Sequence, residues 1–283
     1  MSKYRKILVA YDGSDSSRTA LAVAADLAKK DKCWIKVLAV VPPYYGDLEL
    51  IGVSKIKETI EGPGQDILAE AKQLAKDHDV HILTNLEQGE PYDRIVHVAD
   101  DENCDLIVIG RRGRRHLERE LMGGVTARVI GYTKRNVLVV PEGANLSWEN
   151  ILVATDESEN SRHAFDLALD IAKERSAQLS AMSVIYTNDE LSAFAPDHVT
   201  EMVQSKRSFH ADLKTKAAGK DVKLSTYVRE GEPHEQITDL ANEIKASVIV
   251  MGTHGRKGLH RILMGSVTER TIGYSSCPIM IVH

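Results

Sequence analysis

Short apolar runs alternate with segments of helical periodicity along the first half of the chain. Residues 7–10 and 34–41 are brief, continuous apolar runs, which predict buried parallel strands. Between them, apolar residues recur at helical spacing through about Lys30. The same pattern predicts a helix over 65–77, a strand over 80–86, a helix from Pro91 to Ala99, a strand over 106–109, a helix from Gly124 and a strand over 137–140. Strands that alternate with helices predict βαβ units and a mostly parallel sheet.

Residues 44–63 are the least periodic part of this half, and we expect a loop with some helix there. Pro42 and Pro43 end the second predicted strand.

The second half of the chain repeats the first. The run Ile151–Ala154 has the sequence of Ile7–Ala10, and Gly231-Glu232-Pro233 repeats a tripeptide found 142 residues earlier. A short polar stretch over 141–148 separates the two copies. The sequence therefore predicts an internal duplication, with one α/β domain over 1–143 and a second over 144–283.

A glycine pattern follows the fourth predicted strand of the second copy. The strand ends at Gly252, Gly255 follows, and Gly265-Ser266 opens a helix nine residues later. Strand, glycine loop and helix start are the parts of an anion site, because glycines allow positive φ and close approach while helix amides attract negative charge. Glycines that only form a turn are the alternative. The recurrence of the spacing in the first copy favours a site.

Asp156 ends the first strand of the second copy, and ligands of open parallel sheets bind beyond such strand ends. Its acceptor-only carboxylate suits ribose hydroxyls or a base amino group better than phosphate. Val184, near the end of the second strand, is a candidate to line an adenine pocket. The alternatives are a turn or cap role for Asp156, with Ser158 as a helix cap, and a plain core role for Val184.

The joint pattern resembles the nucleotide signature of the universal stress protein family. The glycine spacing and the strand-end Asp match, and the resemblance covers nearly the whole chain as two tandem copies. It implies an α/β fold of the adenine-nucleotide α-hydrolase type, with an open, doubly wound sheet of five parallel strands in each domain. It also implies ATP or AMP as the ligand, with or without Mg²⁺. The implied contacts in the second domain, with the loop histidine added, are Asp156, Val184, Gly252, His254, Gly255, Gly265, Ser266 and Val267.

The first domain departs from the family pattern at one position. Gly124 stands where the family has Ser or Thr, and loss of one hydroxyl donor weakens phosphate binding by about 1–2 kcal/mol. We therefore expect the stronger site in the second domain. The corresponding residues of the first domain are Asp12, Val40, Gly110, Gly113, Gly123, Gly124 and Val125. Four arginines in its loop, Arg111, Arg112, Arg114 and Arg115, are expected to form a solvated basic face, and replacement charge for the phosphates is the alternative.

Composition narrows the classes of partner. A net charge of −5 lacks the basic footprint of a nucleic-acid binder, and no apolar run approaches the ~18 residues of a membrane helix. Three unpaired cysteines and the lack of a signal-peptide pattern predict a cytoplasmic protein. Because family members usually pair through their last strands, the two copies are expected to pair within one chain, and a homodimer of chains is the alternative.

The sequence favours binding over turnover. It contains no Gly-x4-Gly-Lys-Ser/Thr loop and no Gly-x-Ser-x-Gly elbow, and no catalytic set is assigned. A stress-response or signalling module that binds an adenine nucleotide is the leading hypothesis. The alternatives are slow ATP hydrolysis with His254 as an acid, and a scaffold or binder of another ligand such as a metal ion. No four-ligand metal pattern is found among the eleven histidines.

Overall fold

The computed structural model describes residues 4–41, 43, 53–113, 122–186, 196–255 and 264–283. The chain divides into two compact units, Met1–Ala144 and Asn145–His283. Each unit alternates strands with helices, and we describe each by itself.

Unit 1 contains five parallel strands in the order β3-β2-β1-β4-β5. Its first strand lies at the centre, so that Ile7 is opposite Ile35 on one side and Leu106 on the other. The elements are β1 (Lys6–Ala10), α1 (Asp15–Asp31), β2 (Trp34–Val41), α2 (Val53–Asp77), β3 (Ile82–Gln88), α3 (Pro91–Asp101), β4 (Leu106–Gly110), α4 (Gly124–Tyr132) and β5 (Asn136–Val140).

Unit 2 repeats this order as β10-β9-β6-β7-β8, again with parallel pairs. Its central strand places Ile151 opposite Leu179 and Val248. The elements are β6 (Asn150–Ala154), α5 (Glu159–Arg175), β7 (Gln178–Ile185), α7 (Pro196–Ala218), β8 (Leu224–Glu230), α8 (Pro233–Glu243), β9 (Val248–Gly252), α9 (Ser266–Tyr274) and β10 (Ile279–Val282).

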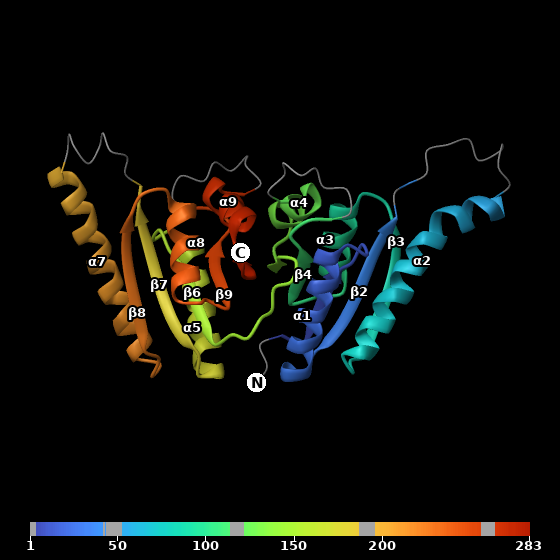
Figure 1. Ribbon diagram of the computed structural model, residues 1–283, viewed down its shortest axis with the longest axis horizontal. Helices are drawn as coiled ribbons and strands as arrows, with labels where there is room; N and C mark the ends of the chain where they lie inside the picture. The colour runs from blue at the N-terminus through green and yellow to red at the C-terminus, as the bar shows by residue number, and fades with distance from the viewer. Residues whose placement is uncertain (1–3, 42, 44–52, 114–121, 187–195, 256–263) are drawn as a thin grey trace. The chain divides into compact units, whose positions relative to one another are not determined.

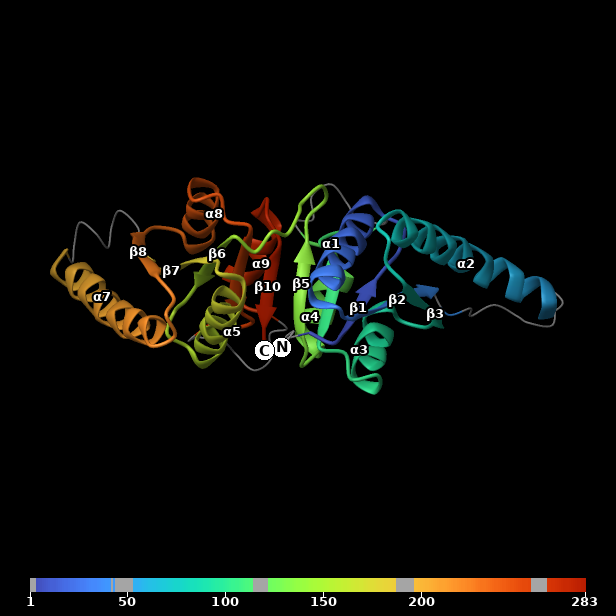
Figure 2. The same cartoon turned by 90° about the horizontal axis from the view of Figure 1, so that it is seen from below.

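Helices cover both faces of each sheet. In unit 1, α1 and α2 pack on one face and α3 and α4 on the other (Figures 1 and 2). The central strands are buried along most of their length, as expected for strands covered on both sides. The fold class predicted from the sequence, two tandem doubly wound α/β domains, is confirmed.

The topology brings two strand ends together in unit 2. From β6 the chain moves outward to β7 and β8, and it then returns to the other side of β6 as β9. The carboxyl ends of β6 and β9 therefore lie side by side where the strand order reverses, which is where open α/β sheets bind ligands.

Two predicted elements have different bounds in the structure. Helix α2 begins at Val53, well before the predicted residue 65, and it continues through Pro63. Strand β3 begins at Ile82 and not at residue 80, because the amide of Val80 bonds to the Ala75 carbonyl and closes the end of α2. Of the aperiodic stretch 44–63, residues 44–52 lie outside the described residues.

None of the helices within the described ranges is long and apolar enough to cross a membrane. All three cysteines are free thiols, and Cys104 is buried. Burial raises the pKa of the Cys33 and Cys104 thiols to about 11.

Candidate functional site

The loop between β6 and α5 is shaped by hydrogen bonds of Asp156 and Ser158. The Asp156 Oδ1 atom accepts from Ser158 N at 3.1 Å and from Ser158 Oγ at 2.6 Å. Ser158 is the N-cap of α5 and accepts from the Ser161 amide. An Asp that accepts from the backbone two residues on forms an Asx turn. The turn role of Asp156 and the cap role of Ser158 are therefore confirmed, and the Asp156 carboxylate stands at the end of β6.

The two glycines after β9 permit close contacts between elements. A Cβ on Gly252 would lie 2.7 Å from the Asn160 Cβ in the first turn of α5, and a Cβ on Gly255 would lie 2.5 Å from the Asp156 Oδ2 atom. Neither glycine has a positive φ, and the same holds for Gly265. The described glycines of this loop therefore do not use the positive φ that glycine allows. Glycine is favoured at positions 252 and 255 because Asn160 and the Asp156 carboxylate lie where a Cβ would be placed.

Helix α9 begins beside this loop without a side-chain cap. Its N-cap is Gly265, whose own amide donates to the Thr253 carbonyl at 2.9 Å and is therefore occupied inside the protein. The amides of the first turn, from Ser266 to Thr268, have no acceptor within the helix. The Thr268 hydroxyl donates to the Gly252 carbonyl at 3.1 Å and holds the helix against the end of β9. The helix start thus presents backbone donors and the positive end of its dipole.

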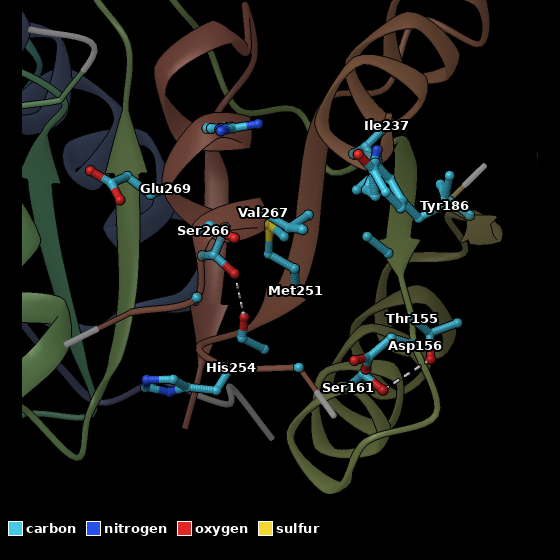
Figure 3. Close-up of a pocket in the computed structure, with 18 of the residues that line it drawn as sticks. Thr155, Asp156, Ser161, Tyr186, Ile237, Met251, His254, Ser266, Val267 and Glu269 are labelled. Atoms are coloured by element: carbon cyan, nitrogen blue, oxygen red, sulfur yellow. Dashed lines mark hydrogen bonds between the residues drawn. The ribbon is translucent and has the colours of Figure 1, made fainter. Parts of the chain in front are cut away.

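These features surround one cavity of about 720 Å³ in unit 2. Figure 3 shows Asp156 and Thr155 on one side of the hollow and Ser266 and Val267 on the other. The structure brings all eight residues singled out in the second domain to its lining, namely Asp156, Val184, Gly252, His254, Gly255, Gly265, Ser266 and Val267.

The wall of the cavity includes side chains that sequence reasoning missed. Tyr186, Ile237 and Met251 form part of an apolar wall, and Glu232, Glu269 and Arg270 add charges. Helix α8 supplies Glu232 as its N-cap, and the repeated Gly-Glu-Pro tripeptide was the one sequence signal at this position. The pattern indicated a helix start only, because the contact of α8 with the cavity depends on tertiary packing.

Two of these added charges, Glu232 and Arg270, are paired with each other. The Arg270 Nη1 atom donates to Glu232 Oε1 at 3.0 Å, and the same oxygen lies 3.2 Å from His234 Nδ1. The carboxylate of Glu232 is therefore balanced by a guanidinium, and Asp156 and Glu269 are the other carboxylates in the lining.

His254 lies in the glycine loop, and its ring is directed away from Asp156 (Figure 3). It is close enough to the C-terminal residue to affect that residue's charge. Burial first, and His254 second, lower the pKa of His283 to about 4.

Unit 1 reproduces the backbone frame of the site. Asp12 Oδ1 accepts from Ser14 N at 3.1 Å and from Ser14 Oγ at 2.6 Å, and a Cβ on Gly113 would lie 2.7 Å from Asp12 Oδ2. Gly110 packs against Ser16 as Gly252 packs against Asn160.

The helix start of unit 1 differs in one respect. Gly123 is the N-cap of α4, and its amide donates to the Arg111 carbonyl at 2.9 Å. Gly124 follows in open space, with no atom within 4 Å of an added Cβ. Val125 is 38% exposed, and Val40 near the end of β2 is partly buried. Unit 1 therefore has the frame of the site without the hydroxyl that Ser266 supplies in unit 2.

The arginines of the first loop are not a fully solvated face. Arg111 and Arg112 are both partly buried, so this expectation is wrong for them. Burial lowers the pKa of the Arg111 guanidinium, and the neighbouring charge of Arg112 adds to the effect. Arg114 and Arg115 lie outside the described residues.

Across the described ranges, no three His, Cys, Asp or Glu side chains gather closely enough to hold a metal ion.

The fold and the site define a class of α/β proteins in which a strand-end Asp and a glycine loop face an uncapped helix start. The sequence profile of the Universal stress protein family matches residues 3–141 and again residues 147–283. The chain therefore belongs to the universal stress protein family and carries two tandem copies of its domain.

Relatives that match about half of the chain and relatives that match nearly all of it both support this assignment. A universal stress protein of Methanocaldococcus jannaschii is 34% identical over 148 residues, which are 51% of this chain and 86% of that protein. One from Mycolicibacterium smegmatis is 25% identical over 98% of this chain and 96% of its own length. The crystal structure of a universal stress protein from Archaeoglobus fulgidus has the same fold, with a TM-score of 0.72, 22% identity and coverage of 100% of this chain and 98% of that one.

Proposed function

We propose that this protein binds an adenine nucleotide, ATP or AMP, in the cavity of unit 2 and acts as a stress-response or signalling module. One observation carries the proposal. A single cavity of about 720 Å³ combines a carboxylate, a glycine loop, an uncapped helix start and an apolar wall. Its volume is within the range of roughly 300–1,000 Å³ that is usual for small-molecule sites.

The chemistry of the lining divides between the parts of a nucleotide. The first-turn amides of α9 and the Ser266 hydroxyl are donors and suit phosphates, with or without Mg²⁺. Asp156 accepts only, and it suits ribose hydroxyls or a base amino group. Val184, Ile237 and Met251 provide apolar surface for a purine ring.

Unit 1 is proposed to bind more weakly, because Gly124 supplies no hydroxyl at the helix start. We propose that the last strands, β5 and β10, pair with each other within one chain, in the way that the last strands of two single-domain relatives are expected to pair. A homodimer of whole chains is the alternative. Sedimentation of the purified protein distinguishes these two states. We place the protein in the cytoplasm, where adenine nucleotides are abundant.

We infer a binding protein without dedicated turnover. The side chain that was a candidate acid, His254, is directed away from Asp156 (Figure 3), and a general acid must be placed at the reacting group. Substitution of His254 by Ala should leave any slow phosphate release from ATP unchanged. Loss of that release on substitution would indicate a hydrolase instead.

The test is nucleotide binding to the intact chain. Acid release and chromatography should identify any nucleotide that copurifies, and titration calorimetry should measure ATP and AMP binding to the emptied protein. Asp156→Asn keeps an Asx-turn former but removes the carboxylate, so it should abolish the tighter site. The matched variant Asp12→Asn should leave that site intact. The proposal fails if no nucleotide is found and neither ATP nor AMP raises the melting temperature.

A further inference from the structure

One face of helix α7 makes two polar contacts that reach the neighbours of cavity residues. The helix packs along β7 and β8 (Figure 1). Lys206 Nζ lies 2.7 Å from Glu157 Oε1, and His210 Nε2 lies 2.9 Å from Ser183 Oγ. Lys206 and His210 are four residues apart and therefore share a face of the helix.

Both contacts are removed from solvent. The side chains of Lys206 and Glu157 are only 14% and 12% exposed, and His210 and Ser183 are 3% and 1% exposed. Polar groups with so little access to water need partners, and here each is the other's partner.

The positions of these contacts in the chain connect them to the cavity. Glu157 directly follows Asp156, and Ser183 directly precedes Val184. Asp156 and Val184 both line the cavity, at the ends of β6 and β7. Helix α7 therefore holds the backbone on two sides of the hollow through one pair of side chains on each side.

Unit 1 has no polar residue at any of the four equivalent positions. The equivalent positions follow from aligning α2 with α7 just after their last turns. Asp79 and Asp221 have φ of 52° and 60°, and in each unit the next amide donates to the carbonyl five residues before it. In the place of Lys206 and His210 stand Gly64 and Leu68, and in the place of Ser183 stands Ala39. Gly13 takes the place of Glu157. The two polar contacts are a property of unit 2, the unit with the complete helix start.

The backbone at Glu157 indicates that its side chain is needed. Glu157 has φ of 73°, the same value as Gly13 in unit 1. Glycine adopts this conformation freely, whereas a residue with a Cβ is strained there. Strained residues persist where surrounding contacts fix them, and they cluster at ligand sites. The ion pair with Lys206 fixes the Glu157 side chain, while the Glu157 backbone donates to Thr155 Oγ1 at 3.4 Å and accepts from Arg162 Nε at 3.3 Å.

The second contact joins two neutral groups at pH 7. Burial, followed by the charges of Lys206 and Lys214, lowers the pKa of His210 to about 4, and Glu157 opposes the shift. The hydrogen bond between His210 and Ser183 is therefore present across the physiological range.

We propose that α7 is a clamp on the nucleotide site of unit 2, in which Lys206 and His210 are positioning residues that hold the Asp156 loop and the end of β7 in the binding arrangement. This inference rests on the proposed function of the same cavity. In physical terms, the clamp raises the fraction of molecules whose cavity is ready for ligand, and the apparent affinity rises with that fraction.

Titration calorimetry with ATP and melting curves without ligand test the clamp on the full chain. Glu157→Gly installs the residue of unit 1, relieves the strain and removes the ion pair, and Lys206→Met removes the pair from the other side. Each should weaken ATP binding about tenfold, as expected if the ready fraction falls to about a tenth. The melting temperature of the Glu157→Gly variant should stay close to wild type, because relief of strain offsets the lost contact. Lys206→Arg should restore wild-type affinity.

The second contact has its own matched variant. Ser183→Ala combined with His210→Leu installs the apolar pair of unit 1, which preserves packing, and this variant should also bind ATP more weakly than wild type. A merely structural role would change the melting temperature and leave the affinity unchanged. Wild-type affinity in both Glu157→Gly and Lys206→Met overturns the clamp.

Amide hydrogen exchange separates this inference from the proposed function. In the ligand-free protein, Glu157→Gly and Lys206→Met should accelerate exchange over residues 155–158 and 183–186. If the wild-type chain binds no nucleotide, the proposed function fails. In that case unchanged exchange in both variants overturns the clamp, and accelerated exchange supports the clamp as a feature of the cavity.

Discussion

At the scale of single residues, the glycines of one motif are required for different physical reasons. Gly252 is buried against α5, where an added Cβ would meet the Asn160 Cβ at 2.7 Å and its carbonyl carbon at 2.9 Å. Gly255 faces the Asp156 Oδ2 atom, which belongs to a side chain able to rotate. The first glycine is therefore required by the packing of β9 against α5, and the second by the position of the Asp156 carboxylate.

This difference predicts different effects of alanine at the two positions. Gly252→Ala should lower the free energy of unfolding by about 1–3 kcal/mol, because backbone must move to admit the methyl group. Gly255→Ala should change stability little but weaken nucleotide binding, because it displaces the Asp156 carboxylate. Urea denaturation and calorimetry measure the two effects. Gly124→Ala, in open space at the start of α4, is the control that should neither lower stability nor alter the affinity of unit 2, and equal losses of stability at positions 252 and 255 would refute the distinction.

Gly124 also predicts a gain of function. Since no atom lies within 4 Å of its added Cβ, Gly124→Ser should fit without strain and supply the hydroxyl that α4 lacks. Nucleotide affinity of unit 1 should rise by about 1–2 kcal/mol, measured by calorimetry in an Asp156→Asn background that silences unit 2. Gly124→Ala is the matched control. An affinity no higher than that of the alanine variant would show that the hydroxyl does not reach the ligand.

At the scale of elements, the helices differ in how their first turns are satisfied. Helices α1 and α5 carry serine caps, Ser14 and Ser158, which accept from amides three residues on. Helices α4 and α9 begin at glycine caps without a side-chain bond. At the candidate sites, α4 and α9 thus leave their first-turn amides to another acceptor, which is the arrangement that an anion needs.

A cap added to α9 should therefore compete with the ligand. Gly265 has the extended backbone of an N-cap, and its nearest neighbour to an added Cβ is the Thr253 carbonyl at 3.4 Å. Gly265→Ser should raise stability by a few tenths of a kcal/mol and lower nucleotide affinity, because the new hydroxyl occupies an amide of the first turn. Gly123→Ser makes the same change in unit 1 and should leave the affinity of unit 2 unaltered. Tighter binding by Gly265→Ser would contradict this account of the site.

The sequence predicted those parts of the site that depend on local chemistry. Asp156, Ser158 and the glycine spacing follow from strand ends, turns and caps, which are formed by residues close together in the chain. Glu232 and Arg270 were missed, because their contact joins α8 to α9 and requires the packed fold. The start of α2 was missed because Gly62, Pro63 and Gly64 interrupt helical periodicity, although the helix runs through them.

At the scale of the whole molecule, duplication has produced two units with the same frame and different interiors. Unit 1 fills the space below its second helix with Leu68 and Ala39, and unit 2 places His210 and Ser183 there. A buried histidine makes the stability of one unit depend on pH in a way that a leucine does not.

This contrast predicts a specific loss of stability in acid. The pKa of His210 and that of His283 are both lowered from 6.5 to about 4 in the folded chain, chiefly by burial. The unfolded chain therefore binds these protons first, and stability that is complete above about pH 6.5 is lost as the pH falls toward 4. Urea titrations at a series of pH values across this range give the slope of the free energy of unfolding against pH. In the His210→Leu variant, this slope should decrease by the equivalent of up to about one proton. The same slope in both proteins would refute the assignment.

The hydrogen bond from the Gly265 amide to the Thr253 carbonyl joins the two ends of the loop that separates β9 from α9. Because this backbone hydrogen bond holds the two loop ends together, residues inserted between them should lower the free energy of unfolding only slightly. The cost of loop closure rises by about 0.6 kcal/mol for each doubling of loop length. The same closure exists in unit 1 between Gly123 and Arg111. Each unit therefore offers an entry point for a fused reporter domain, and in unit 2 the graft would start beside the cavity whose occupancy it is meant to sense.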